Sequence, residues 1–179
     1  MEVIDTKLDG VKVIYPAVFH DERGYFFESY QKEKWQLDVD FVQDNEAFST
    51  KGILRGLHYQ LPPYTQSKLV RVVQGEVLDV VVDIRPDSPT YGEHLSIVLS
   101  GTNFKQLFVP KGFAHGYVVL TDTAIFSYKC DTYYQKTSEA GIRWDDAQLN
   151  IDWILPPSSL ILSEKDKDLP NFGAHQKYE

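Results

Sequence analysis

The sequence predicts a single all-β domain, a sandwich or a barrel, with few short helices. Short alternating or apolar segments follow one another along the chain and are separated by turn residues such as Pro62-Pro63. Aromatic residues, which strands and ligand cavities favour, make up 13% of the sequence, and signals for helices are weak. A chain of 179 residues is long enough for one hydrophobic core and short for two.

The expected strands share period-two alternation or a continuous apolar run between turn residues. In chain order they are Val11–Tyr15, Tyr25–Tyr30, Phe41–Ser49, Ile53–Gln60, Lys68–Gln74, Val77–Arg85, His94–Ser100, Lys105–Val109, Gly116–Leu120 and Ala124–Tyr134. Short helical turns are expected at Gln31–Gln36 and Ser163–Asp168.

The segment Val77–Arg85 carries acidic side chains in an unusual place. Alternation puts Asp79 and Asp83 on one face together with Val77 and Val81. Carboxylates on a dry core face are costly. We therefore expect this face to border a wet cavity or to supply hydrogen-bond partners for both carboxylates.

Charge and composition exclude several classes of protein. The net charge of −8 argues against a nucleic-acid-binding surface, although a few local cations could still hold one nucleotide diphosphate. Cys130 is the single cysteine, so no intrachain disulfide forms, which fits a reducing cytoplasm. The N-terminal segment does not resemble a secretory signal, and no apolar run approaches the ~18 residues of a membrane span. The expectation is a cytoplasmic protein with neither a nucleic-acid nor a membrane partner.

His58 and His115 lie in apolar, strand-like surroundings, where a histidine is either structural or catalytic. A hairpin joining Ile53–Gln60 to Lys68–Gln74 would place Lys68 diagonal to His58. A base beside a cation suits proton removal next to a carbonyl, because the cation stabilises the oxyanion that forms. Taken alone, Lys68 fits a solvated lysine at a strand edge better than a catalytic group.

Arg55 and two tyrosines are further candidates. Alternation places Arg55 on the face opposite His58, unless a bulge at Gly56 brings both to one face. Otherwise Arg55 serves the rim of a site or a neighbouring subunit, and its planar fork suits a diphosphate. Tyr128 and Tyr134 share one face of Ala124–Tyr134, where they either look into the same cavity or simply pack.

The segment Pro110–Gly116 is similar to the second half of the cupin signature, P-x-G-x-x-H. Metal-binding cupins supply His-x-His and then a glutamate in the first half, but Val81 and Asp83 stand at the two histidine positions here. One histidine with scattered carboxylates is a poor ligand set for zinc, iron or manganese. The sequence therefore predicts a cupin that has no metal and whose side chains carry out the chemistry.

Further motifs occur in a specific order over nearly the whole chain. They are Asp21–Phe26 with Glu28, Gln43–Asn45, Gly52–Gln60, Gln66–Arg71, Gly75–Asp79, Asp83–Arg85, Ser88–Gly92, Pro110–Gly116, Tyr128-Lys129, Arg143–Asp146 and Leu162–Asp166. In these motifs the sequence resembles the dTDP-4-dehydrorhamnose 3,5-epimerase family. It departs from the family at Ala47, where serine is frequent, and at Ala147, where proline is frequent.

The resemblance implies a cupin-type double-stranded β-helix, or jelly-roll barrel, over residues 1–179. It also implies a homodimer whose N-terminal segment packs across the interface. The reaction would invert C3 and C5 of a dTDP-linked 4-keto-6-deoxyhexose without any cofactor. His58 would be the base, Asp166 its carboxylate partner, Tyr128 the proton donor on the opposite face of the sugar, and Lys68 the group that stabilises the enolate oxygen.

The resemblance also implies a set of substrate-binding residues, some of them contributed by the partner subunit. The set comprises Arg23, Phe26, Glu28, Gln43, Asn45, Arg55, His115 and Tyr134. Asp79 would support a histidine.

Other functions remain open from the sequence. Related keto-sugar epimerases invert C3 or C5 only, and a 3,4-ketoisomerase uses similar enol chemistry. A metal-dependent cupin and a non-catalytic sugar-binding cupin are the remaining alternatives. Metal analysis, product analysis and deuterium exchange into bound ligand separate these possibilities.

Overall fold

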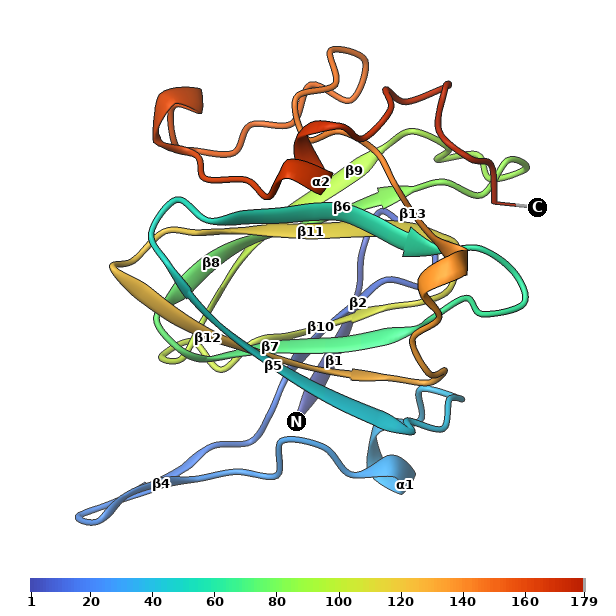
Figure 1. The fold of residues 1–179 in the computed structure, drawn as a ribbon. Coiled ribbons are helices and arrows are strands. Elements are labelled where there is room, and N and C mark those ends of the chain that lie inside the picture. The colour runs from blue at the N-terminus through green and yellow to red at the C-terminus, as the bar shows by residue number, and fades with distance from the viewer. Residues whose placement is uncertain (179) are drawn as a thin grey trace.

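The computed structural model describes residues 1–178 as two sheets that face each other, with a separate hairpin (Figure 1). The six-stranded sheet has the order β1 (Glu2–Asp5), β2 (Lys12–Tyr15), β10 (Gln106–Val109), β7 (Lys68–Gln74), β12 (Thr123–Cys130) and β5 (Gln43–Thr50). The five-stranded sheet has the order β13 (Glu139–Gly141), β6 (Leu54–Gln60), β11 (Phe113–Val119), β8 (Glu76–Asp83) and β9 (His94–Ser100). The hairpin consists of β3 (Phe19–Asp21) and β4 (Gly24–Phe26).

The main core lies between the sheets, because alternating residues of both sheets point inward. Phe126, Leu107 and Val70 from one sheet meet Val81 and Val119 from the other, and all are at most 2% exposed. The apolar side chains leave part of this interior to polar residues. This polar part of the interior contains the candidate active site.

Each sheet also has a covered outer face. Residues of the C-terminal segment, including Trp153 and Phe172, pack on the outer face of the five-stranded sheet. Trp35 of α1 (Lys32–Trp35) packs against the outer face of the six-stranded sheet. The second α-helix, α2 (Glu164–Lys167), and the 3-10 turns η1 (Lys136–Ser138) and η2 (Pro157–Ser159) complete the elements. The two predicted helical turns are confirmed, with Gln31 and Ser163 as N-caps.

The predicted strands are found, most of them with shifted ends, and three strands were not predicted: β1, β3 and β13. These are short, and every residue of β1 and β3 is exposed, so they lack the apolar alternation that marks a strand in a sequence. Strand β12 ends at Cys130 and does not continue to Tyr134. Two backbone N–H groups beyond Cys130 donate to side chains instead of to a neighbouring strand: Tyr134 N–H donates to Gln43 Oε1 at 3.1 Å, and Gln135 N–H donates to Gln60 Oε1 at 2.7 Å.

The predicted hairpin between the Ile53–Gln60 and Lys68–Gln74 segments is wrong. Strand β6 pairs with β11 and β13, whereas β7 pairs with β10 and β12 in the other sheet. The loop between them crosses from one sheet to the other through Pro62 and Pro63, which have no N–H for a hairpin ladder. The two strands therefore face each other across the interior.

Both carboxylates on the acidic face of β8 have hydrogen-bond partners. Asp83 is fully buried and accepts hydrogen bonds from Arg85, Ser88 and Thr90. Burial alone would raise the pKa of Asp83, but these donors more than offset it and leave the pKa below its usual value. Asp79, also fully buried, bonds a histidine of the site.

Within residues 1–178, each helix is too short or too polar to cross a lipid bilayer.

Candidate active site

A cavity of about 550 Å³ opens between the two sheets beneath the C-terminal segment. It contains six of the residues singled out in the sequence: Arg55, His58, Lys68, His115, Tyr128 and Asp166. They come from β6, β7, β11, β12 and α2, so the fold gathers residues that are far apart in the chain. The volume suits a small organic ligand.

His58 and Asp166 are hydrogen-bonded to each other on one wall of the cavity. His58 Nε2 lies 2.6 Å from Asp166 Oδ1, and the two side chains are 26% and 5% exposed. Strand pairing fixes His58, while Ser163 caps α2 by accepting from the Asp166 N–H. Burial alone would raise the pKa of Asp166, but the hydrogen bond and charge of His58 hold it below its usual value.

Of the two alternatives left open for Arg55, the structure has the bulge at Gly56. The pairing of β6 with β11 runs from His58 opposite His115 to Arg55 opposite Tyr117, so three steps on β6 match two on β11. A glycine is required there: its φ is +127°, and a Cβ would come within 2.6 Å of the Gly116 Cα. The bulge brings Arg55 and His58 into the same cavity, and Arg55 donates to Ser49 Oγ.

Lys68 and Tyr128 face His58 from the opposite sheet. The Lys68 Nζ atom lies 6.0 Å from the centre of the Tyr128 ring. Burial lowers the pKa of Lys68 and raises the pKa of Tyr128 to about 12. The phenol therefore keeps its proton at neutral pH. No carboxylate among the described residues forms an ion pair with Lys68, so its donors can serve a ligand.

His115 is held by a second buried carboxylate. Its Nε2 lies 2.9 Å and 3.0 Å from the two carboxylate oxygens of Asp79, and both side chains are buried. Asp79 thus contacts a histidine, as the sequence resemblance implies. It orients the ring of His115 toward the cavity.

Three other predicted residues lie beside the cavity without lining it. Gln43 donates to Asn45 Oδ1 at 3.0 Å, on the same face of β5 as the cavity residue Ala47. Tyr134 is 50% exposed and donates to Glu139 Oε2 at 2.8 Å.

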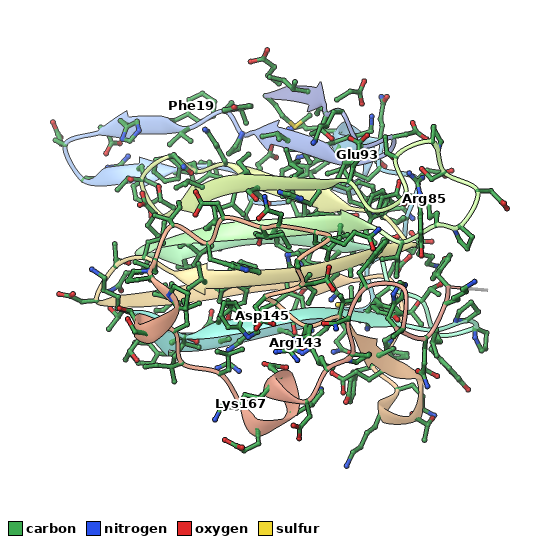
Figure 2. The ribbon with its side chains drawn as sticks, turned by 90° about the horizontal axis from the view of Figure 1, so that it is seen from above. Phe19, Arg85, Glu93, Arg143, Asp145 and Lys167 are labelled. Carbon is green, nitrogen blue, oxygen red and sulfur yellow. The ribbon has the colours of Figure 1, made fainter. Side chains whose placement is uncertain are left out.

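Arg23, Phe26 and Glu28 are not brought to this cavity. The β3–β4 hairpin projects from the body of the molecule, and Phe26 is 68% exposed. Figure 2 shows Phe19, at the start of this hairpin, and Lys167, at the end of α2, on opposite sides of the stacked strands. Arg23 pairs with Asp21, and Glu28 pairs with Lys34.

Several lining residues were not predicted. Lys165 lies next to Asp166 on α2 and pairs with Glu139, which also accepts from Tyr134. Tyr117 follows His115 by two residues on β11, so alternation along that strand was the signal that could have found it.

The family model for dTDP-4-dehydrorhamnose 3,5-epimerase matches residues 5–174 of this sequence. The chain belongs to this family. It is therefore an epimerase, and the predicted family and enzyme class are confirmed.

Relatives of known function and structure agree with the assignment. The dTDP-4-dehydrorhamnose 3,5-epimerase of Shigella flexneri is 51% identical over 170 residues, which cover 93% of each chain. The Legionella pneumophila enzyme, solved with dTDP-4-keto-L-rhamnose, has a TM-score of 0.92 and 47% identity, covering 97% of this chain and 93% of its own. The Bacillus anthracis epimerase, solved with TDP and pyrophosphate, has a TM-score of 0.92 and 44% identity, covering 96% and 99%. These likenesses confirm the cupin-type jelly roll.

For this member of the epimerase family we expect activity to survive exhaustive chelation. Val81, at a position where metal-binding cupins have histidine, pairs with His115 across β8 and β11. Within residues 1–178, His, Cys, Asp and Glu do not gather in groups of three or more that could hold a metal ion. The measurement is turnover before and after chelation, with bound metal quantified. Loss of activity that one added metal restores would contradict the prediction.

Proposed function

We propose that the protein inverts both C3 and C5 of a dTDP-4-keto-6-deoxyhexose by proton transfer through an enolate. The observation that carries the proposal is the cavity itself, which places His58 of one sheet, bonded to Asp166 of α2, across from Tyr128 and Lys68 of the facing sheet. A base and a proton donor on opposite walls suit inversion. Relatives solved with dTDP-4-keto-L-rhamnose and with TDP support the thymidine diphosphate part of the ligand.

The first step is proton removal by His58. Asp166 accepts the hydrogen of Nε2, which leaves Nδ1 with its lone pair free to take a proton. The C4 ketone acidifies the hydrogens on C3 and C5. When Nδ1 takes one of them, the C–H electron pair moves into an enolate, and Asp166 stabilises the imidazolium.

The second step returns a proton on the other face of the sugar. Lys68 holds the negative charge on the enolate oxygen at C4. Tyr128 gives its phenolic proton to the carbanion carbon from the side opposite His58, which inverts that centre. The phenolate then takes a proton from solvent and the His58 imidazolium releases one to solvent, which restores both groups. A second turn of the same cycle inverts the other carbon.

The experiment that tests the proposal is incubation with dTDP-4-keto-6-deoxyglucose in D2O, followed by NMR. We expect deuterium at both C3 and C5 of an inverted product. Label and inversion at one carbon only would identify a monoepimerase, and a ketone moved to C3 would identify a 3,4-ketoisomerase. Bound substrate that gains no deuterium would identify a sugar-binding protein.

The site also requires a second subunit in this proposal. Arg23, Phe26 and Glu28 match the nucleotide-contacting motif of the family, but they lie on or next to the projecting hairpin, outside the cavity of their own chain. Phe19, Tyr25 and Phe26 leave large apolar surfaces exposed on this hairpin. A homodimer would bury these surfaces and would bring Arg23 to the partner's cavity.

We expect Arg23→Ala to weaken nucleotide binding more than it slows the chemistry of bound substrate. The lost group is a cation for the diphosphate, which acts on binding rather than on proton transfer. The measurements are dTDP affinity by calorimetry and single-turnover rate at saturating substrate. Arg143→Ala is the matched control, because Arg143 is also a surface arginine paired with an aspartate two residues away. A fully active monomer in solution would contradict the arrangement.

A further inference from the structure

The hydroxyl of Tyr117 is an unusual polar group. Tyr117 is 5% exposed, and its ring stacks on Phe126 with 4.1 Å between centroids and 16° between planes. Its hydroxyl oxygen is buried without a hydrogen-bond partner. Among the side chains that the structure describes, only the Nε2 of His175 shares this condition. A buried polar group without a partner is costly, and such groups are rare in folded proteins.

Tyr117 lies at the ligand cavity, whereas His175 lies on the far side of the five-stranded sheet, against Tyr59 and Phe172. Along β11, alternation points Tyr117 to the same side as His115. Across the ladder it stands opposite Arg55. Its ring and the side chain of Arg55 both line the cavity.

The neighbouring polar groups do not satisfy the phenol. Ser49 and Arg55 lie close enough to counter part of the rise that burial causes in the pKa of Tyr117. They bond each other instead, with Arg55 Nη2 at 3.3 Å from Ser49 Oγ. Phenylalanine would stack on Phe126 equally well and leave no unpaired oxygen, so packing does not account for the hydroxyl.

We propose that the Tyr117 hydroxyl donates a hydrogen bond to an oxygen of the bound sugar nucleotide, next to an oxygen held by Arg55. The inference rests on the proposed function and adds a specificity-determining residue to the site. The acceptor is a phosphate oxygen or a sugar oxygen. Arg55 has five N–H donors, so it can bind such an oxygen while it keeps Ser49. Binding therefore supplies the partner that the phenol lacks in the free protein.

The test compares Tyr117→Phe with wild type in calorimetric titrations with dTDP and with dTDP-glucose, which lacks the ketone and does not react. Tyr117→Phe keeps the stacked ring, so the melting temperature should not fall. We expect affinity to drop about tenfold, the usual size for a lost hydrogen bond to a charged group. Tyr59→Phe is the matched control, because Tyr59 is also 5% exposed but donates to the Gln176 carbonyl outside the cavity.

The two ligands distinguish the acceptors. An equal loss for both supports a phosphate oxygen, and a loss for dTDP-glucose alone supports a sugar oxygen. Unchanged affinity for both ligands in Tyr117→Phe, with wild type binding normally, overturns the inference and leaves the proposed function intact. A wild-type protein that binds neither ligand overturns the proposed function as well.

Discussion

Replacing His58 with alanine is expected to abolish exchange of the substrate hydrogens at both C3 and C5. In the proposed reaction a single base, His58, serves both carbons. A positioned general base contributes about 10²–10⁴ in rate, so turnover should fall by at least that range. The measurement is deuterium incorporation from D2O at each carbon, followed by NMR. Near-normal exchange in His58→Ala would mean that the base is misassigned.

Asp166→Asn supplies the companion measurement. The amide keeps the shape of the side chain but removes the charge that stabilises the imidazolium, so this variant should also be slow. Asp166 has a lowered pKa and is ionised at neutral pH, which makes its charge available under ordinary assay conditions. Asp145→Asn is a suitable control, because Asp145 is an aspartate with a lowered pKa that pairs with Arg143 outside the cavity. Equal rates for the two variants would remove Asp166 from the mechanism.

Replacing Tyr128 with phenylalanine is expected to separate proton exchange from inversion. The variant keeps the ring and its packing against Phe126, so folding should hardly change. His58 can still remove a proton and return one on its own face of the sugar. The variant should therefore wash deuterium into the substrate while it forms little inverted product.

The ratio of deuterium incorporated to product formed, compared with wild type, decides the role of Tyr128. A raised ratio supports Tyr128 as the donor, whose raised pKa keeps the proton in place until the enolate forms. If exchange and inversion fall together or both persist, the ratio does not change. Tyr128 would then be structural, and water or another side chain would be the donor. Tyr134→Phe tests the second phenol that the sequence singled out.

The fold followed from the sequence because its central strands carry strong signals. β7 was predicted with its observed ends, as was the edge strand β9, and the predicted bounds of β8 differ from the observed ones by at most two residues. β1 and β3 were not predicted, because an exposed strand has no buried apolar face and therefore no apolar alternation in its sequence. The mistaken hairpin of β6 with β7 has a different cause: alternation shows which side chains share a face, but not which sheet a strand joins. The next strand along the chain was assumed to be the partner.

The site was predictable in part for similar reasons. The bulge at Gly56 could be foreseen, since Arg55 and His58 fit one cavity only if alternation breaks between them. The position of Tyr134 could not be foreseen. Strand β12 ends before Tyr134, and the backbone N–H groups of Tyr134 and the next residue donate to the side chains of Gln43 and Gln60. The unpaired hydroxyl of Tyr117 depends on how Ser49 and Arg55 pair with each other, and a sequence contains no sign of that.

The pairing of His58 with Asp166 also has a consequence for synthesis of the protein on the ribosome. The two residues are 108 positions apart, and Asp166 lies on a helical turn that follows the last strand, β13. A growing polypeptide exposes the strand bearing the proposed base long before the ribosome adds its carboxylate. Prematurely terminated products can therefore hold the imidazole but lack the group that orients it. In the proposed mechanism, full catalytic rate then requires translation through Asp166.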